Sequence, residues 1–236
     1  MLSVVFGTSG GIGREMARQL ATRGNGAVFG VSRSEADELP GVTPLRADFT
    51  DEDALAGIAE TIKAAGSPDL VIVASGLLSD GDTLQPEKSY KQQSLGAFQQ
   101  IFEANTFGPA LVAKHMLPLM PRKGRAVFAA LSARVGSISD NGLGGWHAYR
   151  ASKSALNMLI RNYAIEQGRR NEAFIAVGLH PGTVDTDLSK PFQGNVPDKK
   201  LFTPEYSARA LLDVLDRLTP DQSGNVFDYA GERVPA

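Results

Sequence analysis

A short apolar run followed at once by a glycine-rich segment opens the chain, and it restricts the possible folds more than any other feature. Residues 2–6 (Leu-Ser-Val-Val-Phe) are typical of a buried strand. Residues 7–13 (Gly-Thr-Ser-Gly-Gly-Ile-Gly) follow, and apolar residues then recur at helical spacing until Gly24. Strand, glycine-rich turn and helix form the first half of a dinucleotide-binding βαβ unit. Glycines let the backbone approach a pyrophosphate and the helix N-terminus supplies free N–H groups, so we expect a nucleotide to bind here.

Strand-like apolar runs and helical patterns alternate along the rest of the chain. We predict strands at 27–31, 41–46, 69–74, 125–131, 174–179 and 224–228, and helices at 50–65, 95–120, 147–168 and from 203 onwards. The helix over 95–120 is expected to break near Gly108 and Pro109, and Thr50 is expected to cap the helix that it precedes. The alternation predicts a single doubly wound, Rossmann-type α/β domain over residues 1–236, with a parallel seven-stranded sheet and helices on both faces.

The end of the second predicted strand favours NADP over NAD. Sites that bind NAD place an acidic residue there to accept the ribose hydroxyls, whereas this chain has Ser32 and Arg33. A guanidinium can hold a 2′-phosphate in a forked geometry, and Arg14 is a second cation within reach of that group. Glu35 and Asp37 leave NAD open, because either carboxylate could fold back to the ribose.

Composition excludes several other classes of function. Net charge is −2, so there is no electrostatic footprint for nucleic acid. The chain has no cysteine, which excludes disulfides and thiol catalysis, and its three histidines lack metal-ligand spacing, so we predict no metal site. No apolar run approaches the ~20 residues of a membrane span, and the first residues do not resemble a signal peptide. We therefore expect a cytoplasmic protein that does not associate with membranes.

Tyr149 and Lys153 are the candidate chemical pair. They stand four residues apart in a helical pattern, so both side chains lie on one face about one turn apart. A nearby cation favours the phenolate and lowers the pKa of a tyrosine from its ordinary value near ~10. The alternative interpretation is an aromatic ring that packs on a lysine stem.

Further candidates follow the ends of predicted strands, where open α/β sheets bind their ligands. Ser132 ends the strand over 125–131, and Asn105 is a polar residue amid apolar neighbours that needs hydrogen-bond partners. Asp48 follows the third strand, and either accepts the adenine amino group or serves as an ordinary loop or capping carboxylate. Residues 183–202 lack periodicity over a length that is unusual for a bare connection, so we interpret them as a loop that shapes the substrate site.

Taken together, these motifs resemble those of the short-chain dehydrogenase/reductase family over nearly the whole chain. Within that family, residues 132–138 and Gly144-Gly145-Trp146 resemble the C-factor (cell–cell signalling) branch. The residues that carry the resemblance are Gly7-x-x-x-Gly11-Ile12-Gly13, Asp48, Asn105, Ser132, Tyr149-x-x-x-Lys153 and Pro181-Gly182-Thr183.

The resemblance implies a catalytic tetrad. Tyr149 would be the general acid for carbonyl reduction, and Lys153 would lower its pKa and hold the nicotinamide ribose. Ser132 would hydrogen-bond the substrate oxygen, and Asn105 would hold a water in a proton relay to Lys153. Such donors stabilise the oxyanion that forms when a hydride reaches a carbonyl.

It also implies an NADP-preferring oxidoreductase for a small carbonyl or alcohol, assembled as a homodimer or homotetramer. The alternative is a nucleotide-binding signalling or regulatory protein of C-factor type, in which the nucleotide is structural or a sensor ligand. The expected cofactor-binding residues are Gly7, Ser9, Gly10, Gly11, Ile12, Gly13, Arg14, Ser32, Arg33, Asp48, Phe49, Ala74, Ser75, Gly76, Tyr149, Lys153, Pro181, Gly182 and Thr183.

Overall fold

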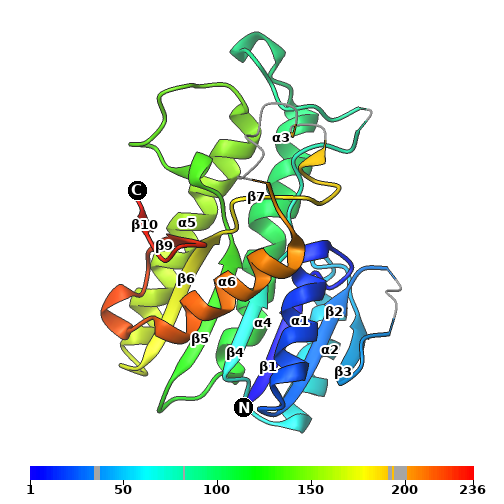
Figure 1. Ribbon diagram of the computed structural model, residues 1–236, viewed down its shortest axis with the longest axis vertical. Helices are drawn as coiled ribbons and strands as arrows, with labels where there is room; N and C mark the ends of the chain where they lie inside the picture. Colours follow the sequence, from blue (N-terminus) through cyan, green and yellow to red (C-terminus); the bar gives the residue numbers. More distant parts are fainter. Residues whose placement is uncertain (35–37, 82, 191–192, 194–200) are drawn as a thin grey trace.

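Parallel strands form the centre of the molecule and helices cover both faces (Figure 1). The computed structural model describes residues 1–34, 38–81, 83–190, 193 and 201–236. Its central strands are β1 (Leu2–Phe6), β2 (Ala27–Ser32), β3 (Val42–Arg46), β4 (Leu70–Val73), β5 (Ala126–Leu131), β6 (Phe174–His180), β9 (Val226–Asp228) and β10 (Arg233–Val234). They pair in the order β10-β9-β6-β5-β4-β1-β2-β3.

The sheet of the described residues has eight strands rather than the predicted seven. The additional strand, β10, pairs antiparallel with β9 at the edge of the sheet. Its two residues, Arg233 and Val234, are too few to produce a periodic pattern in the sequence. A separate pair, β7 (Thr183–Val184) with β8 (Leu201–Phe202), lies within the segment that we interpreted as a substrate loop. The doubly wound α/β fold itself is confirmed.

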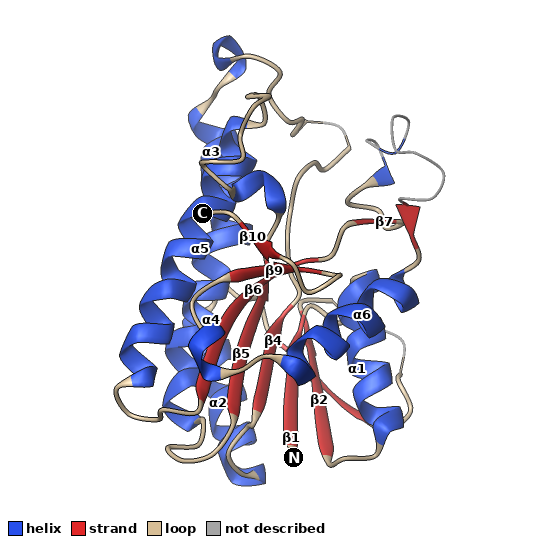
Figure 2. Cartoon of the chain, turned by 60° about the vertical axis from the view of Figure 1, so that its left-hand side comes forward, coloured by secondary structure: helices blue, strands red, loops and turns tan. Residues whose placement is uncertain are grey.

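The helices divide into two layers, one on each face of the sheet (Figure 2). They are α1 (Gly11–Arg23), α2 (Glu52–Ala65), α3 (Leu95–Phe102), α4 (Gly108–Met116), α5 (His147–Gly168) and α6 (Pro204–Arg217). Short 3₁₀ turns lie at Tyr90–Gln92, Leu117–Leu119, Arg134–Gly136 and Pro220–Gln222. Helices α1 and α6 bury apolar residues against one face, and α2, α4 and α5 bury theirs against the other. None of the helices that the structure describes is long and apolar enough to span a bilayer.

The order of the strands places a crevice beside β1. Strand β1 pairs with β2 on one side and with β4 on the other, and all three run parallel. The chain therefore moves outward from β1 to β3, and then returns across β1 to begin β4. In doubly wound sheets, ligands bind outside the carboxyl ends of the strands at this reversal.

The predicted break in the long helix occurs, but it lies before Gly108 rather than at it. Residues Glu103–Phe107 form one π-helical turn between α3 and α4, and the Gly108 amide donates to the Glu103 carbonyl. Pro109, just after this turn, has no N–H to donate to the Asn105 carbonyl four residues earlier, so the ordinary helical bond is absent there. The widened turn sets the side chain of Asn105, which is fully buried.

The cap of α2 is Asp51, so the prediction of Thr50 was wrong. The Asp51 carboxylate accepts from the amides of Asp53 and Ala54, each at 3.0 Å. The Thr50 hydroxyl instead donates to Asp48 at 2.8 Å. The two residues are adjacent and both favour caps, so the sequence pattern alone does not distinguish them.

This difference gives a test of the fold. Asp51→Ala removes the cap, so we expect the free energy of unfolding to fall by about 1 kcal/mol. Thr50→Ala leaves the cap in place and serves as the matched control, for which we expect less than half of that loss. Urea denaturation of both variants measures the difference, and a larger loss for Thr50→Ala would contradict the assignment.

Candidate active site

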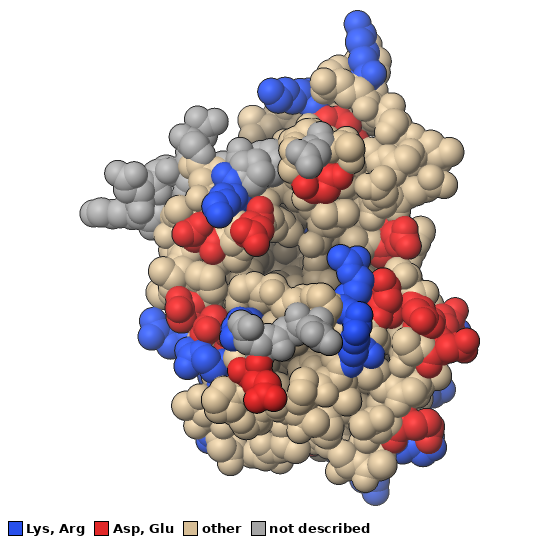
Figure 3. All heavy atoms as spheres, turned by 90° about the vertical axis from the view of Figure 1, so that its right-hand side faces the viewer, with Lys and Arg blue, Asp and Glu red and all other residues tan. Residues whose placement is uncertain are grey.

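Two adjoining cavities lie at the carboxyl edge of the sheet, and the hollow that they form is visible on one face of the molecule (Figure 3). The first has a volume of about 440 Å³ and the second about 450 Å³. Both are lined by Ser9, Gly10, Ala74, Ser75 and Gly76, which places the glycine-rich turn and the end of β4 between them. A ligand in contact with these shared residues can extend into both cavities.

Gly7 and Gly13 pack the start of α1 against the sheet. A Cβ on Gly13 would lie 2.3 Å from the Gly7 carbonyl oxygen, and Gly7 itself has a φ of +96°. Larger residues at these positions would push the turn away from β1. Gly10 caps α1 without a side-chain hydrogen bond, and the first turn carries no acidic residue. The N-terminal N–H groups therefore remain suited to an anion.

Ser75 adds an unsatisfied donor to the same crevice. It follows β4, and its buried hydroxyl oxygen has no hydrogen-bond partner among the described residues. A buried polar group of this kind costs free energy unless something pairs with it. The glycine turn and the Ser75 hydroxyl thus fit a nucleotide laid across the ends of β1 and β4.

The second cavity collects the residues that we expected around the adenosine half of a cofactor. It is lined by Arg33, Asp48 and Phe49 together with Ser34 and Thr50. The amide and hydroxyl of Thr50 both donate to Asp48, and the backbone hydrogen bond is the main reason that the pKa of this carboxyl lies below its ordinary value. This loop role was the alternative that the sequence left open for Asp48.

Four of the predicted site residues line neither cavity. These are Gly13, Arg14, Ser32 and Asn105. The Ser32 hydroxyl donates to the Ser34 carbonyl at 2.7 Å, so it shapes the loop beside Arg33. The alternative ribose acceptors Glu35 and Asp37 lie outside the described residues.

Tyr149 and Lys153 lie together in the first cavity. Both are on α5, and both are buried, with 8% and 2% of their surfaces exposed. The Lys153 ammonium lies 5.8 Å from the centre of the Tyr149 ring and donates to the Leu131 carbonyl at 2.8 Å. Trp146 packs edge-on against the Tyr149 ring at 6.3 Å. The expected pair is therefore present, and both side chains line the cavity although little of their surface is exposed.

The pKa values of the pair differ from expectation. Burial raises the pKa of Tyr149 to about 12 and lowers the pKa of Lys153 to about 7. Removing each group from water disfavours its charged form, and this is the cause of both shifts. The expectation that Lys153 lowers the Tyr149 pKa is not met. Tyr149 therefore retains its proton at neutral pH.

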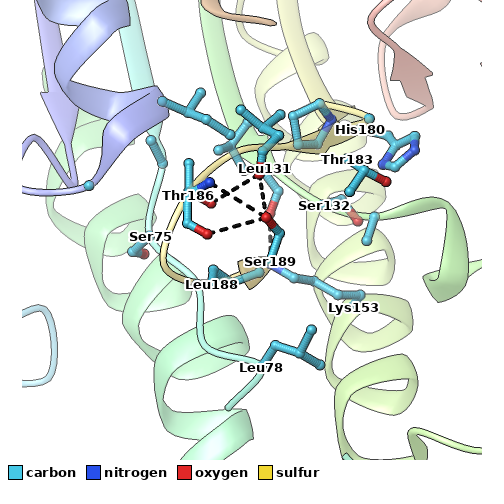
Figure 4. Close-up of a pocket in the computed structure, with 18 of the residues that line it drawn as sticks. Ser75, Leu78, Leu131, Ser132, Lys153, His180, Thr183, Thr186, Leu188 and Ser189 are labelled. Carbon is cyan, nitrogen blue, oxygen red and sulfur yellow. Dashed lines mark hydrogen bonds between the residues drawn. The ribbon is translucent and has the colours of Figure 1, made fainter. Parts of the chain in front are cut away.

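Ser132 lies directly beyond β5, within the same cavity. Its amide donates to the Leu179 carbonyl of β6 at 2.8 Å, which fixes its backbone. Its hydroxyl donates to Oδ1 of Asn157 at 2.6 Å. Figure 4 shows Ser132 and Lys153 beside the same cavity. We did not predict Asn157, although it stands four residues beyond Lys153 and thus on the same face of α5.

Asn105 is held by the connection after β4 and by α5. Its Oδ1 accepts from the Leu77 amide at 2.7 Å, and its Nδ2 donates to the Leu77 carbonyl at 2.8 Å and to the Ser152 hydroxyl at 3.1 Å. A Cβ on Gly76 would lie 3.5 Å from Asn105 Oδ1 and 3.6 Å from Lys153 Nζ. Asn105 and Lys153 thus flank the same small space, but no direct hydrogen bond joins them.

The segment after β6 lines the first cavity. Pro181, Gly182 and Thr183 line it as expected, and so do residues 184 and 186–189, which we had not named individually. The Ser189 hydroxyl donates to the Val184 carbonyl, and the Ser189 amide donates to the Thr186 carbonyl at 3.0 Å, which closes a tight turn (Figure 4). That turn presents Leu188 to the cluster that contains Tyr149.

Known proteins are similar to this chain in sequence. The "C-signal" protein of Myxococcus xanthus is 41% identical over 134 residues, or 57% of this chain and 75% of that protein, which confirms the predicted likeness to C-factor proteins. A 1-hydroxy-2-glutathionyl-2-methyl-3-butene dehydrogenase of a Rhodococcus species is 31% identical over 94% of this chain and 93% of its own.

Solved structures share the fold. An NADPH-bound carbonyl reductase from chicken fatty liver superposes with a TM-score of 0.84 at 23% identity, over 100% of this chain and 94% of that one. A short-chain dehydrogenase/reductase from Burkholderia multivorans with bound NADP gives a TM-score of 0.82 at 23% identity, over 100% and 99% of the two chains. The model of the short chain dehydrogenase family matches residues 2–196. This match spans most of the sequence, and the chain therefore belongs to the short-chain dehydrogenase family.

Proposed function

We propose that the protein is an oxidoreductase that reduces a small carbonyl compound with NADPH, or oxidises the corresponding alcohol. One observation supports this most strongly: buried Tyr149, Lys153 and Ser132 line one cavity, which adjoins the glycine-rich turn. A protein that only bound a nucleotide would have no need for a phenol, an amine and a hydroxyl at that position. The Rhodococcus relative, whose name is that of a dehydrogenase, adds support.

The residues of the chain divide between binding and proton transfer. The turn at residues 7–13, Ser75 and residues 181–183 would hold the nucleotide, and Arg33 would hold its 2′-phosphate. The bound nicotinamide nucleotide supplies the hydride. Lys153 would hold the adjoining ribose, and Asn105 would orient a water beside it.

Tyr149 would deliver the proton to the substrate oxygen. Burial raises the pKa of this phenol to about 12, so Tyr149 carries at neutral pH the proton that an acid has to give. In alcohol oxidation the same side chain would take the proton back. The surroundings of the phenol are apolar, since Trp146, Leu78 and Leu188 line the cavity, and this favours a substrate with an apolar body.

A second candidate function is nucleotide-dependent signalling. The identity of 41% to a protein named "C-signal" favours it, over 57% of this chain. The two functions differ in one measurable way. A panel of aldehydes and ketones with NADPH oxidation as the readout would give turnover for the enzyme, whereas firm NADPH binding without any turnover would favour signalling.

We also infer that the protein assembles as a homodimer or homotetramer. Four exposed apolar residues support this, namely Leu95, Phe107, Met158 and Ile165. They lie on α3, on the π-helical turn and on α5, that is, on the helices next to the site. The segment over residues 183–202 is proposed to shape the substrate site. Residues 191–192 and 194–200 lie outside the described residues, and the cavity contacts of residues 186–189 support this part of the proposal.

The proposed acid is tested by Tyr149→Phe. The variant keeps the ring but has no proton to give, so we expect kcat to fall by about 10²- to 10⁴-fold while NADPH binding is unchanged. Tyr163→Phe is the matched control, because Tyr163 is a partly buried tyrosine on the same helix that lines neither cavity. Turnover that survives Tyr149→Phe would contradict the mechanism.

The proposed 2′-phosphate contact is tested by Arg33→Ala. Loss of a charge-assisted hydrogen bond should raise the Kd of NADPH by about tenfold or more and leave the Kd of NADH almost unchanged. Arg23→Ala is the control, since Arg23 pairs with Asp213 and Asp216 away from the cavities. Fluorescence titration measures both constants. Equal affinity for the two nucleotides in the wild-type protein would refute the assignment.

The buried amine of Lys153 predicts a pH dependence of stability. Its pKa is about 7 in the folded protein and 10.5 in its ordinary environment. Between these values the unfolded chain binds the extra proton, so the folded protein becomes more stable as the pH rises. Below about pH 7 the amine is protonated in both the folded and the unfolded protein, so the full free-energy cost of burying its charge lowers the stability.

Comparison with Lys153→Met isolates this effect. The stability of the wild type relative to that variant should increase between pH 7 and pH 9, by at most about 1.4 kcal/mol per pH unit. Urea denaturation at several pH values gives the difference. Lys63→Met, at an exposed lysine, should show no such slope. A pH-independent difference for Lys153→Met would contradict a buried, neutralised amine.

A further inference from the structure

The hydroxyl of Ser132 has a partner that the proposed mechanism does not use. It donates to Oδ1 of Asn157 at 2.6 Å. Tyr149, Lys153 and Asn157 follow one another at intervals of four residues, so they share one face of α5. Lys153 donates to the Leu131 carbonyl, and Asn157 accepts from Ser132. Two successive residues at the end of β5 are thus tied to two successive turns of α5.

This tie restricts the side chain of Ser132, whose backbone the sheet already holds. The Ser132 amide is bound to the Leu179 carbonyl at 2.8 Å, so its backbone is fixed by β6. The hydroxyl still has three staggered positions about χ1. The hydrogen bond to Asn157 selects one of them.

We propose that Asn157 is a positioning residue, which holds the Ser132 hydroxyl beside the reacting oxygen and sets the direction of its hydrogen. The proposal rests on the proposed function, because it gives Ser132 the task of donating to the substrate oxygen. Asn157 itself touches neither substrate nor nucleotide in this scheme, and it lines neither cavity.

The chemistry of an amide explains why asparagine suits this position. A hydroxyl has one hydrogen, and in this structure the Ser132 hydrogen points to Asn157 Oδ1. Reduction of a carbonyl builds negative charge on the substrate oxygen, which requires that hydrogen. A half-turn of the amide presents Nδ2 in place of Oδ1. The amide then donates to Ser132 Oγ, and the Ser132 hydrogen is free for the substrate.

Isosteric replacements separate these two roles. Leucine has the size of asparagine but neither accepts nor donates. An ionised aspartate accepts and cannot donate, so it would keep the Ser132 hydrogen away from the substrate. We expect Asn157→Leu to lower kcat by about 10- to 100-fold, and Asn157→Asp to lower it at least as much. The Kd of NADPH should not change in either variant.

A double-mutant cycle tests whether Asn157 acts through Ser132. In the Ser132→Ala background, Asn157→Leu should cause no further loss of kcat. Asn162→Leu, at an exposed asparagine on α5 that lines neither cavity, is the matched control and should retain wild-type kcat. Wild-type kcat in Asn157→Leu or Asn157→Asp, or losses that multiply in the double variant, would overturn the proposal.

A second readout does not depend on turnover. The side-chain amide resonances of Asn157 in the ¹⁵N-labelled protein should shift in Ser132→Ala and stay in place in Asn162→Leu. Unchanged resonances in Ser132→Ala would show that the contact is absent and overturn the proposal. If Tyr149→Phe retains full turnover, the proposed function fails, and these resonances still decide whether Asn157 holds Ser132.

Discussion

Parallel pairing is the constraint on which the rest of the structure depends. Strands β3, β2, β1, β4, β5, β6 and β9 run in one direction, so all their carboxyl ends meet at one edge of the sheet. The residues that follow these strand ends therefore lie close together. This is how the glycine-rich turn after β1, Ser75 after β4 and Ser132 after β5 lie around adjoining cavities.

Burial then sets the chemistry at that edge. Helix α5 lies over the end of β5 and carries Tyr149, Lys153 and Asn157 on the face that meets Leu131 and Ser132. Water is largely excluded from the phenol and the amine, so each favours its neutral form. A phenol that keeps its proton can donate it to a substrate oxygen. A hydroxyl that is hydrogen-bonded to an amide can change the direction of its own hydrogen. Both properties suit the reduction of a carbonyl better than the storage of a nucleotide.

Local patterns predicted the parts of the site that depend on neighbours in the chain. The sequence predicted the glycine-rich turn, the Tyr149–Lys153 spacing and the strand end at Ser132, because each lies within a few residues of an apolar run or a helical pattern. Asn157 stands four residues beyond Lys153, so the same spacing places it on the same face of α5. Nothing in the sequence indicated which strand end it would meet.

Other features of the structure were not predictable from these local patterns. Burial raises the pKa of Tyr149, and the cluster that buries it includes Leu78, Leu84 and Leu188 from separate segments. The π-helical turn at Glu103–Phe107 begins before the glycine and proline that predicted the break. Strand β10 is too short for any periodicity, and the choice of Asp51 over Thr50 as a cap depends on the competing bond from Thr50 to Asp48.

Transfer of a hydride to a carbonyl carbon within the first cavity is the central claim. It can be followed directly with NADPH that carries deuterium at both positions of the nicotinamide C4 carbon. Incubation of the wild-type protein with this nucleotide and a panel of apolar aldehydes and ketones should yield an alcohol that is one mass unit heavier than the alcohol formed with unlabelled NADPH. Firm binding of NADPH without a labelled alcohol from any member of the panel would contradict the claim.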